Sequence, residues 1–237
     1  MKTMICLILD RSGSMGGREK DVIGGVNAFI DEQKKLPDPA TIAFVRFDTE
    51  AIERFRDMSN LAECKPLTVA DFQPRGGTPL LDAIGQTIVA LDEDWKREQP
   101  ERAICVIVTD GEENSSRKYK KEQIKQLIQA RQDSGKWAFI YLGANVDAFH
   151  EAGQMGFSAS NTAGYKNTAM GTAALYAAAS DTVSTMRMTG STLATNLGGN
   201  IEEDGSLLNK QPTKPVAAAP VPEWKTPSGN ASWTPPA

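Results

Sequence analysis

The segment Met4-Ile-Cys-Leu-Ile-Leu-Asp10-Arg-Ser12-Gly-Ser14 joins an apolar run to a polar loop. The six residues before Asp10 are apolar without alternation, which indicates a strand that is buried on both faces of a sheet. Oxygen-bearing side chains then occupy alternate positions, at Asp10, Ser12 and Ser14. Gly13 permits the tight turn that lets these three side chains converge. The segment therefore predicts a buried strand that ends in a cluster of oxygen donors.

Apolar, strand-like runs alternate with helical patterns as far as residue 188. Further strands are expected at 41–47, 51–56, 103–110, 137–143 and, weakly, 157–159. Helices are expected at 18–36, 79–95, 120–132, 147–155 and 167–188. This alternation predicts an α/β domain, a mostly parallel sheet with helices on both faces. In such a sheet the binding crevice lies at the carboxyl ends of the strands, where the strand order reverses.

Two more oxygen donors follow other predicted elements. Thr78 stands in Gly76-Gly77-Thr78-Pro79, where a helix begins, and Asp110 ends the apolar run from Ala103. Asp10 and Asp110 both end strongly apolar strands, so we expect them side by side at the carboxyl edge of the sheet. Two such carboxylates would repel each other unless a cation lay between them. Mg²⁺ prefers about six oxygen ligands and retains some water, which suits this set of donors.

The pattern Asp10-x-Ser12-x-Ser14, followed by Thr78 and by Asp110 before a glycine, resembles the metal-ion-dependent adhesion site of von Willebrand factor A-type (vWA) domains. The resemblance covers about residues 1–188 and includes the order of strands and helices. It implies a Rossmann-like sheet, one bound Mg²⁺ or Mn²⁺ held by these five residues, some through water, and metal-dependent binding of a protein partner. An open coordination position would take an Asp or Glu carboxylate of that partner.

Alternative interpretations remain open at this point. Asp-x-Ser-x-Ser alone is a common turn composition, and a vWA domain can keep its fold with an idle site, although no ligand position is substituted here. A metal-dependent phosphoester hydrolase would need a general base, for which His150, Glu112 and Glu113 are the candidates. No phosphate-binding G-x-x-x-x-G-K-[ST] loop is present, and the glycines after Asp10 lack the dinucleotide-binding spacing. The expected function is a non-enzymatic interaction module.

Composition narrows the expected surroundings of the protein. The net charge of −4 gives no electrostatic case for nucleic acid, and the basic run 117–121 is expected to be a helix surface. No stretch approaches the roughly 18 apolar residues of a membrane span, and nothing resembles a signal peptide. The three cysteines form no C-x-x-C motif, and Cys6 and Cys105 lie in apolar strands. These features predict a cytoplasmic protein, similar to intracellular bacterial or phage vWA proteins.

The composition changes near Gly190. We expect a vWA domain over residues 1–189 and a disordered tail, rich in Pro, Gly and Ala, over 190–237. The tail holds two tryptophans in similar contexts, Trp224-Lys-Thr-Pro227 and Trp233-Thr-Pro-Pro236. They are either a docking motif or a chance repeat. An adaptor that binds an AAA-type ATPase or a phage or bacterial assembly through this tail is therefore a further alternative.

Overall fold

The computed structural model describes residues 1–110, 112–144, 148–166, 168–202, 204 and 206–208. Its strands are β1 (Thr3–Asp10), β2 (Ala40–Phe47), β3 (Ile52–Asn60), β4 (Arg102–Thr109), β5 (Trp137–Gly143), β6 (Thr162–Tyr165), β7 (Asn200–Ile201) and β8 (Leu207–Leu208). Its α-helices are α1 (Glu19–Lys34), α2 (Leu80–Glu98), α3 (Lys121–Gln132), α4 (Ala148–Gln154) and α5 (Ala169–Thr189). Short 3-10 turns occur at Gly13–Met15, Leu61–Glu63, Val69–Asp71 and Ala159–Asn161.

One sheet contains all the described strands, in the order β3-β2-β1-β4-β5-β6-β7-β8. The strands from β2 to β7 run parallel, and the two edge strands, β3 and β8, run antiparallel to their neighbours. The chain adds β2 on one side of β1 and later adds β4 on the other side. The strand order therefore reverses between β1 and β4, where a doubly wound sheet opens its binding crevice.

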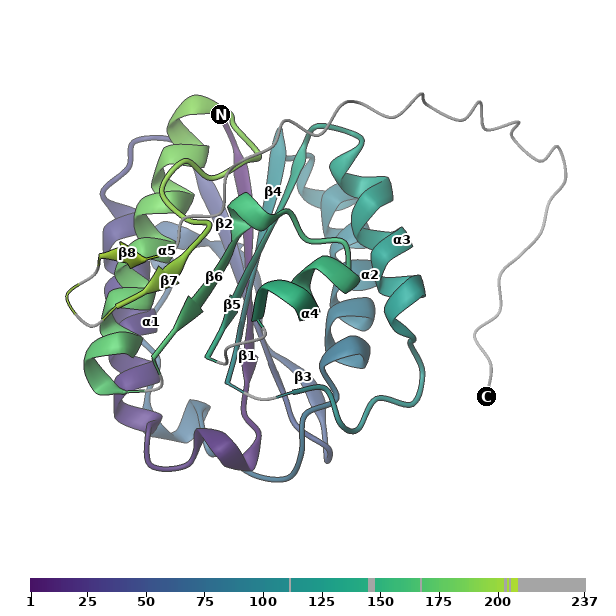
Figure 1. Cartoon of the computed structure of the whole chain (residues 1–237). Coiled ribbons are helices and arrows are strands. Elements are labelled where there is room, and N and C mark those ends of the chain that lie inside the picture. The colour runs from purple at the N-terminus through teal and green to yellow at the C-terminus, as the bar shows by residue number, and fades with distance from the viewer. Residues whose placement is uncertain (111, 145–147, 167, 203, 205, 209–237) are drawn as a thin grey trace, which may run out of the picture.

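Helices cover both faces of the sheet, as the apolar runs predicted. Figure 1 shows α1 and α5 on one side and α2, α3 and α4 on the other. Alternate residues of β1 serve the two cores: Ile5, Leu7 and Leu9 face α1 and α5, whereas Met4, Cys6 and Ile8 face the other helices. The fold class expected from the sequence is confirmed.

A buried polar network joins the ends of α1 and α5. The amide nitrogen of Gln33 donates to the Ser180 carbonyl oxygen (2.9 Å) and to Ser184 Oγ (2.9 Å). The Arg187 side chain, only 1% exposed, donates to the Gln33 carbonyl oxygen (2.7 Å) and the Asp38 carbonyl oxygen (2.7 Å). Its burial lowers the pKa of the Arg187 guanidinium. These bonds fix the carboxyl-terminal half of α5 against α1.

The structure corrects the end of the predicted strand order. The segment Phe157–Ala159 is not a strand, and β6 begins five residues later, at Thr162. Phe157 instead packs edge-on against Phe139, with ring centroids 6.4 Å apart, so its apolar character fills the core under α4. The two-residue strands β7 and β8 are too short to leave a periodic pattern in the sequence.

The folded domain extends beyond Gly190, where the tail was expected to begin. Ala194, Leu197 and Ile201 are buried in the core beside α5, and β7 pairs in parallel with β6. Since an isolated two-residue strand buries little, its attachment depends on these apolar contacts. The remainder of the expected tail, residues 209–237 with both tryptophans, lies outside the described residues.

The cysteines and the lengths of the helices can be compared with the expectations from composition. Cys6 in β1 and Cys105 in β4 are free and buried, as expected for small apolar side chains in strands, and Cys64, after the turn Leu61–Glu63, is also free and buried. Within the described residues, no helix has the length and apolar character needed to cross a membrane.

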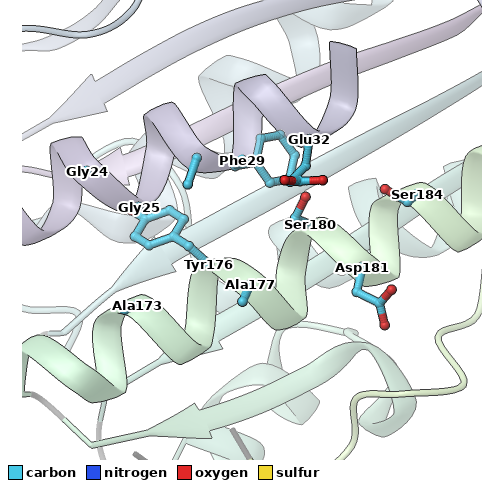
Figure 2. A pocket seen from close by; sticks show the side chains of 11 residues that line it. Gly24, Gly25, Phe29, Glu32, Ala173, Tyr176, Ala177, Ser180, Asp181 and Ser184 are labelled. Carbon is cyan, nitrogen blue, oxygen red and sulfur yellow. The ribbon is translucent and has the colours of Figure 1, made fainter. Parts of the chain in front are cut away.

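Two neighbouring glycines in α1 provide a matched test of how α1 and α5 pack. Figure 2 shows the Tyr176 ring of α5 beside Gly25, and a Cβ on Gly25 would lie 2.2 Å from Tyr176 Cδ2. A Cβ on Gly24 would meet nothing within 4 Å. We expect Gly25→Ala to destabilise the protein by about 1–3 kcal/mol through overpacking. Gly24→Ala should stabilise it by about 0.5–1 kcal/mol through helix propensity. Urea unfolding measures both, and equal effects would contradict this packing.

Candidate metal centre

The centre forms where β1 and β4 end, at the lower edge of the sheet in Figure 1. The Asp10 side chain is fully buried there. Thr109 Oγ1 donates to Asp10 Oδ2 (2.6 Å), and the backbone N–H of Ser12 donates to Asp10 Oδ1 (2.8 Å). The neighbouring strand thus orients the carboxylate from one side, and the loop after β1 orients it from the other.

Hydrogen bonds connect the loop after β1 to the loop after β4. The 3-10 turn Gly13–Met15 brings Ser14 back toward the sheet, where its Oγ lies 2.9 Å from Ser12 Oγ. Ser14 Oγ also donates to Asp110 Oδ1 (2.7 Å). The structure therefore brings together Asp10, Ser12, Ser14 and Asp110, four of the five residues expected from the sequence.

Backbone bonds hold the fifth residue, Thr78, between these two loops. The Gly13 N–H donates to the Gly76 carbonyl oxygen (2.9 Å), which ties the first loop to the segment before α2. The Thr78 N–H donates to Asn114 Oδ1 (2.9 Å), and the Thr78 carbonyl oxygen accepts from the Asn114 N–H (3.2 Å). Gly76 has φ +63°, and a Cβ there would lie 2.2 Å from Thr49 Oγ1, so this segment requires glycine. The Thr78 side chain is buried.

The charge environment of Asp10 suits a bound cation. Burial, with a smaller contribution from nearby Asp110, raises the pKa of the Asp10 carboxyl to about 6, against the lowering effect of the hydrogen bonds from Thr109 and Ser12. A cation placed beside both carboxylates would favour their charged forms. Within the described part of the chain, no three His, Cys, Asp or Glu side chains form a metal-binding group. The donors that do converge are carboxylates and hydroxyls, a set that fits Mg²⁺ or Mn²⁺ better than zinc.

Asp48, directly after β2, connects the loop after β1 to the segment before α2. Its carboxylate is nearly completely buried and accepts from Arg11 Nε (2.8 Å), Arg75 Nε (3.1 Å) and the Glu50 N–H (2.7 Å). Burial acts to raise the pKa of Asp48, but these hydrogen bonds and those from the Ala51 N–H lower it overall. Arg11 lies in the loop after β1, and Arg75 lies in the segment before α2. Because both arginines bind the Asp48 carboxylate, this carboxylate fixes the distance between the loop and the segment.

Glu113 and Asp82 attach the loop after β4 to the start of α2. Glu113 Oε2 accepts from the Leu81 N–H (2.8 Å) and Ser116 Oγ (2.7 Å), and its Oε1 accepts from the Ser116 N–H (2.7 Å). Asp82 binds backbone N–H groups further along the same loop. Both carboxylates therefore stabilise the loop. The link between the two segments has no local signal in the sequence, because Leu81 lies 32 residues from Glu113 and the partners of Asp82 lie 35 to 37 residues away.

The hydrogen bond of His150 lies within α4 and involves none of the candidate ligands. It is exposed on α4, and its Nε2 pairs with Gln154 Nε2 at 2.7 Å. Glu112 is exposed in the loop after β4. Of the three candidates for a general base, Glu113 is committed to the loop and His150 is bonded within α4.

Comparison with known proteins supports the fold. No protein-family model and no curated protein matches the sequence. Among solved structures, the chain is similar to the VWA domain of SpRpn10, with 12% identity and a TM-score of 0.52, over 73% of this chain and 92% of that one. It is also similar to a von Willebrand factor type A protein from Catenulispora acidiphila (16% identity, TM-score 0.55, 76% of this chain and 42% of that one). A third similar structure is the pilus adhesin SpaC from Lactobacillus rhamnosus GG (14%, 0.56, 76% and 29%).

These similarities show that the chain has the vWA fold. The matched region spans less than half the length of the Catenulispora protein and of the adhesin.

Asp48→Asn tests whether this buried carboxylate holds the first two loops. The substitution removes the closer and fully buried of the two carboxylates that pair with Arg11, which is 3% exposed, and leaves only Glu53 at 3.4 Å. We expect a loss of about 3 kcal/mol in the free energy of unfolding. Asp57→Asn is the matched control, because Asp57 is 92% exposed and its ion pair with Arg54 lies at the surface. Urea unfolding measures both variants. Equal stability of Asp48→Asn and Asp57→Asn would contradict the assignment.

Proposed function

We propose that this chain is a non-enzymatic protein-interaction module that holds one divalent cation, Mg²⁺ or Mn²⁺, and captures an acidic side chain of a protein partner through it. The proposed ligands are Asp10, Ser12, Ser14, Thr78 and Asp110. The cation would supply the positive charge that attracts a partner's Asp or Glu carboxylate. Neither nucleic acid nor a membrane belongs to this proposal. A cytoplasmic location, as in intracellular bacterial or phage members, does belong to it.

The hydrogen-bonded series from Asp10 through Ser12 and Ser14 to Asp110 carries the proposal. Its steps, at 2.9 Å and 2.7 Å between side-chain oxygens, gather the donors at one point of the sheet edge. This arrangement needs little rearrangement before the same oxygens can turn toward a common ion. Preorganised donors of this kind favour binding, because little conformational entropy remains to be lost.

The burial of the proposed ligands indicates the side from which a partner would approach the cation. Asp10, Ser12 and Thr78 are buried, whereas Ser14 is exposed and Asp110 is partly exposed. A partner's carboxylate would therefore approach from the side of Ser14 and Asp110. The buried residues would hold the cation from below, where water is excluded and electrostatic attraction is stronger.

Binding is favoured over catalysis by the state of the candidate bases. Glu113 accepts hydrogen bonds from the loop and from α2, and His150 pairs with Gln154, which leaves Glu112 for a hydrolase. The vWA fold also suggests a protein-interaction module. The alternative of an adaptor that acts through its tail depends on residues 209–237, which lie outside the described residues.

Isothermal titration of Mg²⁺ and Mn²⁺ into chelator-treated protein tests the proposed cation site. We expect saturable binding of one ion per chain, lost in Asp10→Ala and weakened about tenfold in Ser14→Ala, since each removes a ligand. Ser14 is exposed, so its variant should fold even if loss of the buried Asp10 carboxylate does not permit folding. Asp133→Ala, an exposed acid on another loop, is the control for lost charge.

Equal binding by wild-type protein and both ligand variants would place the ion elsewhere. Correctly folded wild-type protein that takes up neither ion would contradict the proposed metal dependence.

A further inference from the structure

A cluster of exposed cations lies in the loop after β4. Arg117, Lys118 and Lys120 are exposed, and none of them forms an ion pair within the described part of the chain. The sequence predicted a helix surface here. In the structure these residues precede α3, which begins at Lys121. They are therefore presented by a loop, and we call them the basic loop.

The backbone of the basic loop is held in place by Asp82. This buried carboxylate accepts from the N–H groups of Arg117 (2.8 Å), Lys118 (2.9 Å) and Tyr119 (2.8 Å). The Tyr119 ring packs on Gly85 of α2, where a Cβ would lie 2.7 Å from the ring. A carboxylate that binds three successive amides and a ring seated on a glycine together fix the backbone. The cationic side chains consequently extend from a rigid base.

The basic loop lies beside the proposed cation site. Thr78, a proposed ligand, is hydrogen-bonded to Asn114 in the loop after β4, and Asp82 binds Arg117 three residues further along the same loop. Asp82 lies four positions after Thr78, so their Cα atoms are at most about 14 Å apart. An extended polypeptide advances about 3.3 Å per residue. Side chains two to four positions from the residue at the cation would therefore reach the basic loop.

The exposed charges of this region are mainly cationic. Asp82 is buried and Glu113 is half-buried, and both are turned toward backbone N–H groups, so Glu122 and Glu112 are the exposed acids near the basic loop. Glu112 is exposed, but it precedes Glu113, at the end of the loop next to Asp110. Lys121, the next cation along the chain, donates to Gln154 (2.6 Å).

We propose that the partner segment carries several acidic residues, of which one occupies the cation site and the others contact the basic loop. This inference rests on the proposed function, because it assigns the chemistry of the partner at the same site. The contacts are between exposed charges, so each adds modest affinity, and together they select an acidic segment and speed its association. The net charge of −4 gives the whole chain no long-range attraction for an acidic partner, so the attraction is local to the basic loop.

Two fluorescein-labelled peptides of equal length test the basic loop by fluorescence anisotropy at low ionic strength. One has a single glutamate in a Gly/Ser background, and the other has glutamates at three alternate positions. The full chain should bind the triple-glutamate peptide about tenfold more tightly. The variant Arg117→Ala/Lys118→Ala/Lys120→Ala should lose that preference and keep its Mg²⁺ affinity. The control Lys35→Ala/Lys96→Ala/Lys136→Ala removes the same charge from exposed positions near the opposite ends of the strands, and should keep the preference.

The outcomes separate this inference from the proposed function. Binding of the triple-glutamate peptide that depends on the basic loop but survives EDTA supports the basic loop and contradicts the cation site. Equal affinity for the two peptides, an unchanged preference in the basic-loop variant, or no binding of either peptide would overturn the inference. Tighter binding of an oligothymidylate than of the triple-glutamate peptide would also overturn it.

Discussion

The parallel pairing of β1 with β4 is the constraint on which the candidate site depends. The register that sets Leu9 beside Val108 brings Thr109 within 2.6 Å of Asp10 and places Asp110 at the same edge of the sheet. The pairing is possible because the chain adds β2 on one side of β1 before it returns to the other side. The apolar residues of both strands are buried on two faces, so a shift of one residue would place side chains on the wrong core. The stability of the sheet and the position of the carboxylates therefore have one cause.

Two buried aspartates at this edge have opposite surroundings, and the difference indicates that one is structural whereas the other suits a cation. Asp48 is paired with Arg11 and Arg75, and its pKa is lowered. Asp10 is bonded by Thr109 and Ser12, has no ion pair within the described residues, and has a raised pKa. A carboxylate that already has two arginines gains little from a cation, whereas one held by neutral donors beside a second carboxylate gains more. The lower edge of the sheet thus combines a rigid frame with a site suited to a cation.

The network around Gln33 and Arg187 anchors the far end of α5, so any movement of that helix would have to break buried hydrogen bonds.

Much of this could be predicted from the sequence because it depends on local patterns. Continuous apolar runs located β1 and β4, and the residues that follow them located the candidate ligands. The roles of Asp48, Asp82 and Glu113 could not be predicted, since each binds groups 27 to 37 positions away that only the folded chain brings near. The strand predicted at Phe157 was wrong because an apolar residue before a short strand has the same pattern whether it lies in the strand or packs beneath it. The attachment of β7 depends on Ala194, Leu197 and Ile201, whose i, i+3, i+7 spacing is that of a helix face, although no helix forms between α5 and β7.

The central claim is that one cation binds among the oxygen atoms of Asp10, Ser12, Ser14, Thr78 and Asp110. Anomalous diffraction from crystals grown with MnCl₂ tests it most directly, since manganese scatters anomalously and takes the same oxygen ligands as magnesium. The account predicts a single strong anomalous peak at the carboxyl ends of β1 and β4, about 2.0–2.4 Å from several of these oxygens or from waters bound to them. A strong peak elsewhere on the chain, with none between Asp10 and Asp110, would contradict it.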